Sequence, residues 1–224
     1  MKRKNPQPSS AAVRRAGQIF SRLEEAYPDA VTALSYSMPF ELLVAVILSA
    51  QSTDQQVNKI TEKLFKKYRT PQEFALLTAD QLANDIKGCG LFRNKSKHLV
   101  ETSRILVEQY GGEVPQDRES LMLLPGVGRK TANVVLGVVF GQATFPVDTH
   151  VHRLAHRLGL SSGKSPEQTE LDLCALIPPE QWQRAHHQLI YHGRRVCDAR
   201  KPKCPDCCVN DLCPSAKRSG EGNS

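Results

Sequence analysis

The chain has 224 residues, of which 40% are hydrophobic and 24% charged, and its formal net charge is +7. That length suffices for one large domain or two modest ones, and the composition is that of a soluble globular protein. The positive balance favours a polyanionic partner, with nucleic acid ahead of a membrane surface. The basic N-terminus lacks an apolar stretch, and the longest apolar run, residues 42–48, is too short to cross a bilayer. We therefore expect a cytoplasmic protein with no membrane partner.

Helical periodicity describes the predicted elements along the whole chain. Residues 1–10 read as a flexible basic arm, after which apolar positions recur at helical spacing and capping residues mark helix ends. Residues 134–140 are rich in β-branched side chains, but they continue the preceding segment without a turn residue other than Gly137, which favours helix. We predict an all-α fold without internal repeats. The main predicted helices span residues 11–26, 40–51, 55–68, 94–110, 119–124, 130–140 and 149–159, and two more begin at Ser165 and Pro178.

The stretch Leu-Pro-Gly-Val-Gly-Arg-Lys-Thr-Ala, residues 124–132, joins two of these helices by a tight turn. Gly126 and Gly128 can take positive φ and let the backbone approach a partner closely. The N–H groups at the start of the second helix suit a phosphate, and Lys130 lies in its first turn. The positive end of the helix dipole disfavours an ammonium there, which favours a nucleophilic amine. The alternative is an ordinary helix–turn–helix corner with a solvated lysine, because short motifs match by chance.

Four of the seven cysteines are grouped near the C-terminus with the spacing Cys-x6-Cys-x2-Cys-x5-Cys. Thiols grouped this closely in a reducing compartment predict a metal site. Zinc often uses two Cys-x2-Cys pairs and only one is present, so the uneven spacing favours a [4Fe–4S] cluster without excluding zinc. Cys208 is an alternative to the third ligand, while Cys89 and Cys174 are expected to be buried. The four predicted ligands are Cys197, Cys204, Cys207 and Cys213.

Each of the other candidate residues allows a functional and a structural interpretation. Arg200 and Lys201 lie inside the cysteine cluster, where a pinned cationic loop would bind phosphate, although a solvated charge run is an equal alternative. Asp148 is predicted to cap the helix that begins at residue 149, and a carboxylate there would also stabilise positive charge developing on a sugar. His152 and His156 have the spacing of two metal ligands on one helix face, but no third ligand is in view, so we disfavour that reading.

Three motifs in this order resemble the bacterial endonuclease III family, bifunctional DNA glycosylases and AP lyases of the helix-hairpin-helix superfamily. They are the 124–132 stretch, Val-Asp-Thr-His at 147–150, and the cysteine spacing, and similarity extends over about residues 15–214. The resemblance implies two helical lobes with a helix-hairpin-helix motif. One is a six-helix barrel, residues 32–142, and the other is discontinuous, residues 1–31 and 143–224, and includes the C-terminal [4Fe–4S] loop.

The resemblance also implies roles for particular residues. Lys130 would attack the sugar of a damaged pyrimidine nucleotide in double-stranded DNA, form a Schiff base and cleave the abasic site by β-elimination, with assistance from Asp148. Gln51 and Leu91 would fill the gap left by the extruded nucleotide. A monomer associated with the nucleoid through DNA is expected. The remaining predicted DNA contacts are Gly126, Val127, Gly128, Arg129, His150, Arg200 and Lys201.

Three other functions share parts of this pattern. Adenine glycosylases of the superfamily lack the hairpin lysine, and Lys130 also disfavours a thymine-mismatch glycosylase. A function of another class is a non-catalytic DNA-binding module with structural zinc, which would not require Lys130 and Asp148. The chain departs from the family pattern at Ser52, His152 and Cys208, none of which is expected to take part in the chemistry.

Overall fold

The computed structural model describes residues 7–216, and every regular element within that range is helical. The prediction of an all-α fold is confirmed, since no strand occurs in the described part. Most of the predicted N-terminal arm lies outside these residues. None of the described helices is long and apolar enough to cross a membrane. The chain divides into two compact units, one from Thr32 to Gln142 and the other combining the N-terminal segment up to Val31 with the segment from Ala143 onward.

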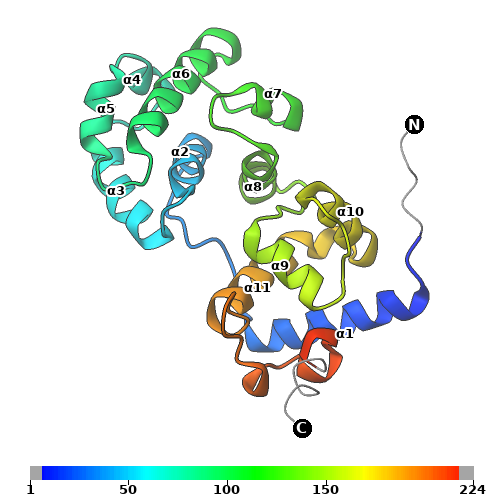
Figure 1. Ribbon diagram of the computed structural model, residues 1–224. Coiled ribbons are helices and arrows are strands. Elements are labelled where there is room, and N and C mark those ends of the chain that lie inside the picture. Colours follow the sequence, from blue (N-terminus) through cyan, green and yellow to red (C-terminus); the bar gives the residue numbers. More distant parts are fainter. Residues whose placement is uncertain (1–6, 217–224) are drawn as a thin grey trace. The chain divides into compact units, whose positions relative to one another are not determined.

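The unit from Thr32 to Gln142 is built around α2, whose residues from Phe40 to Leu48 are all buried (Figure 1). The apolar faces of the other helices pack around it, because a helix that is hydrophobic on all sides is stable only when surrounded. By the observed bounds the unit has seven helices. They are α2 (Pro39–Ser49), α3 (Asp54–Lys67), α4 (Pro71–Ala75), α5 (Ala79–Asp85), α6 (Phe92–Tyr110), α7 (Arg118–Leu123) and α8 (Arg129–Phe140).

The second unit has its own core, in which α1 and α11 pack together and α9 packs against α11. Ile19 and Leu23 of α1 and Leu154 of α9 are completely buried in this core. The C-terminal segment closes over it through buried Val209. The elements are α1 (Ser10–Ala26), α9 (Thr149–Arg157), α10 (Pro166–Leu176), α11 (Trp182–Arg195) and three short 3-10 turns, η1 (Pro179–Gln181), η2 (Cys204–Asp206) and η3 (Asn210–Leu212).

The observed helix bounds differ from the predicted ones by one or two residues at most ends, which is the usual ambiguity of helix termini. The β-branched stretch before Phe140 is helical, as predicted, and Gly141 ends it with φ 64°. The helix predicted to begin at Pro178 is a short 3-10 turn followed by α11.

Candidate active site and cysteine pocket

The turn between α7 and α8 is held to its unit by side chains on both sides. Leu124 and Val127 are buried in the core, and the Thr102 hydroxyl on α6 donates to the Pro125 carbonyl at 3.0 Å. Within the hairpin, Nε of Arg118 on α7 donates to Oδ1 of the buried Asn133 on α8 at 2.9 Å. The two helices and the turn between them therefore form one rigid corner.

The two turn glycines differ, and only Gly126 takes positive φ. Gly126 has φ 79°, and a β-carbon there would lie 3.0 Å from Nδ1 of His98. Gly128 is the N-cap of α8 with φ −92° and ψ 177°, which is extended backbone that any residue adopts. Gly128 therefore does not use the positive φ that glycine allows, because the chain is extended where it enters the helix. The N–H of Val127 donates to the Leu124 carbonyl at 3.1 Å and is therefore already engaged within the turn.

The N-terminus of α8 has the character of an anion site. Gly128 makes no side-chain cap, and the first turn contains no acidic residue but does contain Arg129 and Lys130. The positive end of the helix dipole favours negative charge at such a position. Lys130 is half-buried, and the next turn, from Ala132 to Gly137, is buried, so the lysine extends from a fixed helix.

Asp148 is the N-cap of α9, as predicted. Its Oδ1 accepts from the N–H of Val151 at 2.8 Å, and the residue is half-buried. His150 follows in the first turn, where burial lowers the pKa of its imidazole while the Asp148 carboxylate opposes that shift. Lys130 and Asp148 belong to different units. That the two residues act together in one reaction is therefore a proposal.

Gln51 and Leu91 are the two non-glycine residues with positive φ in the described chain, each at 56°. Both are exposed, and 54% of Leu91 is accessible to solvent. Their loops touch, since a β-carbon on Gly90 would lie 2.9 Å from the Gln51 carbonyl oxygen. A left-handed conformation is unusual for residues of this kind and often marks a functional position.

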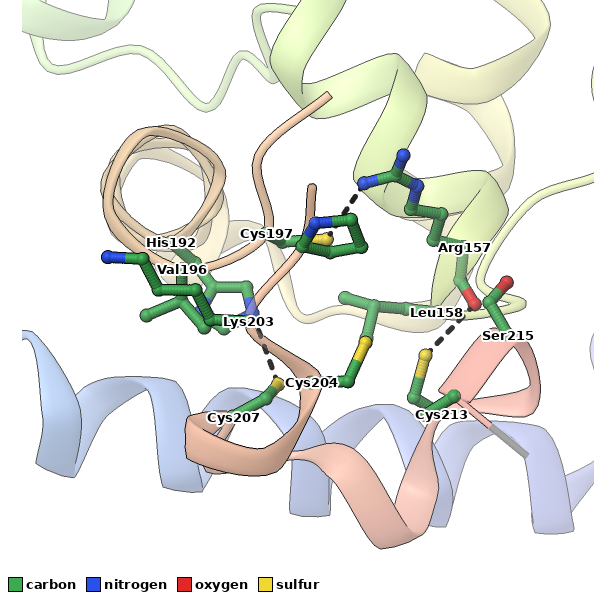
Figure 2. Close-up of a pocket in the computed structure, with 12 residues that line it drawn as sticks. Arg157, Leu158, His192, Val196, Cys197, Lys203, Cys204, Cys207, Cys213 and Ser215 are labelled. Atoms are coloured by element: carbon green, nitrogen blue, oxygen red, sulfur yellow. Dashed lines mark hydrogen bonds between the residues drawn. The ribbon is translucent and has the colours of Figure 1, made fainter. Parts of the chain in front are cut away.

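The four predicted cysteine ligands line one cavity of about 170 Å³ (Figure 2). Cys208 is not among the residues that line it. Its carbonyl instead accepts from Arg22 of α1 at 3.2 Å. The structure thus distinguishes Cys207 from its neighbour, which the spacing alone did not. Four thiols around one space are a suitable donor set for an iron–sulfur cluster or zinc.

The thiols also contact protein groups around the cavity. Sγ of Cys207 lies 3.4 Å from Nε2 of His192, and Sγ of Cys213 donates to the Arg157 carbonyl at 3.3 Å. Burial raises the pKa of Cys207 to about 11 and lowers that of His192 to about 4, so both groups are neutral near pH 7. Among the described residues, no three or more histidine, cysteine or acidic side chains are already arranged around a common metal position. That the four cysteines bind a metal or cluster is therefore a proposal.

The loop between Cys197 and Cys204 is braced by Arg157 of α9. Its guanidinium donates to the carbonyls of Asp198 and Ala199 at 2.6 and 2.7 Å, and the N–H of Arg200 donates to Oδ1 of Asp198 at 3.0 Å. This backbone bond lowers the pKa of the Asp198 carboxyl. Arg200 and Lys201 are exposed on the braced loop, which presents their charges to solvent.

The remaining predictions have mixed outcomes. Cys89 is buried, as expected, but Cys174 is only half-buried. His152 and His156 use ring nitrogens on the Thr169 hydroxyl and the Gly163 carbonyl, at 2.8 and 2.7 Å, which gives each a structural partner.

Sequence reasoning missed a buried lysine, Lys95 on α6, which is 4% exposed. Its position held a usable signal, because Lys95 precedes buried Leu99 by one helical turn and so lies on the apolar face. It also missed Arg157, whose role depends on a loop far along the chain.

Comparisons with known proteins identify the family of the chain. The chain matches the HhH-GPD superfamily base excision DNA repair proteins over residues 44–179. Endonuclease III of Haemophilus influenzae is 50% identical over 196 residues, which are 88% of this chain and 93% of that protein. A trapped endonuclease III–DNA covalent intermediate, an estranged-adenine complex, matches with TM-score 0.89 and 44% identity over 93% of this chain and 98% of that one. A thermostable thymine-DNA glycosylase matches with TM-score 0.82 and 27% identity over 94% and 100% of the two chains. The chain therefore belongs to the HhH-GPD superfamily of base excision DNA repair proteins, and within it to the endonuclease III family.

Proposed function

We propose that this base excision repair DNA glycosylase and AP lyase removes oxidised pyrimidines from duplex DNA and cleaves the resulting abasic site through Lys130. The observation that carries the proposal is the position of Lys130, in the first turn of a helix that begins without a side-chain cap or an acidic residue. A relative at 44% identity has been trapped as a covalent intermediate with DNA, and a covalent intermediate requires a nucleophile such as a lysine amine.

The proposed chemistry proceeds in two stages. The neutral Lys130 amine attacks C1′ of the extruded nucleotide, and the C1′–N bond breaks as the base leaves with its electron pair and takes up a proton. One Nζ proton then passes to O4′ as the C1′–O4′ bond breaks and the sugar ring opens, which leaves a protonated Schiff base between C1′ and Nζ. Loss of a proton from C2′ expels the 3′ phosphate, which cleaves the strand, and water releases the lysine. The Schiff base withdraws electrons from C1′ and so makes the C2′ proton removable.

Asp148 would stabilise the positive charge that develops on the sugar as the base departs. Its cap bond to Val151 fixes the carboxylate before the substrate binds, and a preorganised charge needs no rearrangement during the reaction. The same carboxylate therefore serves both as a helix cap and as an electrostatic partner of the reaction.

DNA would be held mainly through its phosphates. The exposed backbone of Gly126 and Gly128, the Arg129 side chain and the uncapped start of α8 suit one phosphate group. His150 and the exposed cations Arg200 and Lys201 would contact further phosphates. Gln51 and Leu91 would fill the space that the extruded nucleotide leaves. Val127 would support the turn by its burial.

The cysteine pocket would hold a [4Fe–4S] cluster on Cys197, Cys204, Cys207 and Cys213. The cavity of about 170 Å³ supports a multi-atom cluster over one zinc ion, because a single water-sized sphere needs only about 10–15 Å³ on the same measure. When bound, the cluster would cross-link the end of α11 to the loops that follow it and so fix the loop carrying Arg200. Iron and sulfide analysis tests this assignment, and stoichiometric zinc without iron would contradict it.

Borohydride trapping tests the central proposal. The purified chain should form a covalent adduct with a duplex containing an abasic site, and Lys130→Ala should form none. Lys97→Ala, which removes an exposed lysine from α6, is the matched control and should form the wild-type adduct. An adduct that persists in Lys130→Ala would exclude Lys130 as the nucleophile. Absence of an adduct in the wild type would favour the non-catalytic module.

Substrate choice and assembly are tested separately. We expect release of oxidised pyrimidines in preference to thymine opposite guanine. The likeness to a thymine-DNA glycosylase makes the mismatch the informative competitor substrate. Faster release from the mismatch would overturn the lesion assignment but leave the covalent chemistry intact.

We expect a monomer that acts in the cytoplasm on nucleoid DNA, and light scattering of the free protein checks the oligomeric state.

A further inference from the structure

Lys95 is a buried cation that the proposed chemistry does not use. It extends from the first turns of α6 into the Thr32–Gln142 unit, where it is 4% exposed. An ammonium has three N–H donors and no acceptor, and its burial is unfavourable unless those donors are bonded. The hydrogen-bond partners of Lys95 therefore show which segments it connects.

Those partners come from two separate loops. Nζ donates to the Leu48 carbonyl at 2.8 Å and to the Ala50 carbonyl, both at the C-terminal end of α2. It also lies 3.1 Å from Sγ of Cys89 and 3.5 Å from Oγ of Ser52. The negative end of a helix dipole favours a cation at this position. Lys95 thus joins the end of α2 to the turn that precedes α6.

The same two loops carry the two left-handed residues. Gln51 lies between Ala50 and Ser52, and Leu91 lies one turn of helix before Lys95. The N–H of Gly90 donates to Oγ of Ser52 at 3.1 Å, and the thiol of Cys89 donates to the Leu48 carbonyl at 3.1 Å. A left-handed backbone is unfavourable for such a residue, so the surrounding hydrogen bonds must maintain both conformations.

We propose that Lys95 is a positioning residue that holds Gln51 and Leu91 as a preformed pair for insertion into DNA. The inference rests on the proposed gap-filling role of these two side chains. Lys95 is too deeply buried to contact DNA and acts only through the loops that it joins. Because both loops are already in place, the protein does not have to order them when the nucleotide leaves the helix.

The test compares the affinity for a duplex containing a tetrahydrofuran abasic analogue with the affinity for the intact duplex. In the wild type we expect a clear preference for the abasic analogue. Lys95→Met should lower that preference roughly tenfold, the scale of ordering two side chains on binding, with little change in affinity for intact DNA. A 2-aminopurine base opposite the gap should lose its insertion-dependent fluorescence change in the same variant.

Two variants on the same helix serve as controls. Lys97→Met removes an exposed positive charge and should change both affinities by the same factor, which preserves their ratio. Ser96→Ala removes a buried hydroxyl that donates to the Arg93 carbonyl at 2.9 Å, and it should lower stability without changing the ratio. In a Gln51→Ala, Leu91→Ala background, Lys95→Met should have no further effect on the ratio, whereas a merely structural role would still lower it.

Each outcome has one meaning. A wild-type protein without abasic preference contradicts the proposed gap filling itself. A wild-type preference that the folded Lys95→Met variant retains overturns the positioning role alone. If Lys95→Met does not fold, Gly90→Ala replaces it, since its β-carbon would lie 2.9 Å from the Gln51 carbonyl oxygen and push the loops apart without touching the lysine. An unchanged ratio in Gly90→Ala would equally reject the proposal.

Discussion

The helices α8 and α9 begin in opposite ways. Gly128 gives α8 no side-chain cap, and its first turn has cationic and no acidic side chains. Asp148 caps α9 with its own carboxylate, which accepts from the N–H of Val151. A helix N-terminus attracts negative charge, which the N-cap residue itself supplies at α9, whereas the N-cap of α8 is a glycine without a side chain. The difference supports the proposed binding of a phosphate at the start of α8, whereas α9 holds a carboxylate in place at its start.

The largest expected effect comes from separating the two roles of Asp148. Asparagine caps a helix as well as aspartate does, so Asp148→Asn should keep the stability of α9, while Asp148→Ala should lose about 1 kcal/mol of unfolding free energy. Both should lower the rate of base release roughly a hundredfold, the scale of one preorganised electrostatic contact. Single-turnover kinetics and urea unfolding measure the two effects. A fully active Asp148→Asn variant would show that Asp148 acts only as a helix cap.

The next effect distinguishes the two turn glycines. Gly126→Ala should cost about 1–2 kcal/mol of unfolding free energy, because an L-residue is strained at φ 79° and its β-carbon would meet the His98 ring. Gly128→Ala should cost less, since the backbone is extended and no heavy atom lies within 4 Å of the added carbon, so that only the poorer capping by alanine remains. Urea unfolding of the pair is the measurement, and equal losses would contradict the observed difference.

This pair also shows where sequence reasoning succeeds and fails. Capping signals such as Asp148 and Ser165 are local, and both were predicted and observed. The backbone of Gly128 could not be predicted, because glycine is equally at ease in extended and left-handed conformations. The choice of Cys207 over Cys208 depends on how the loop folds over its cavity, and the partners of Lys95 depend on contacts between distant segments. Identity and spacing are visible in a sequence, but non-local packing is not.

A smaller effect should follow from giving α8 the cap that α9 has. Gly128→Asp and Gly128→Asn should each raise the unfolding free energy by a few tenths of a kcal/mol, since glycine is only slightly inferior as a cap. Only the aspartate places a charge where a phosphate is proposed, so DNA affinity should fall roughly tenfold in Gly128→Asp and much less in Gly128→Asn. Anisotropy titrations at two salt concentrations separate the charge effect. Equal affinities in the two variants would mean that no phosphate is bound there.

The smallest effect concerns Asp117, the N-cap of α7, which begins the same hairpin with a charged side chain. Its Oδ1 accepts from the N–H of Ser120 at 2.8 Å, and this backbone bond lowers the pKa of its carboxyl below the ordinary value of 3.8. The folded state therefore binds the proton less readily than the unfolded state. The stabilisation is complete above the unfolded pKa and is lost as the pH falls through the folded pKa. Asp117→Asn keeps an uncharged cap without this titration, so the wild type should lose slightly more stability than the variant below pH 3.8, as measured by urea unfolding. If stability fell with pH in the same way in both proteins, the charge of the α7 cap would have no effect on stability. The lack of a charged cap at α8, in contrast, is proposed to matter for DNA binding.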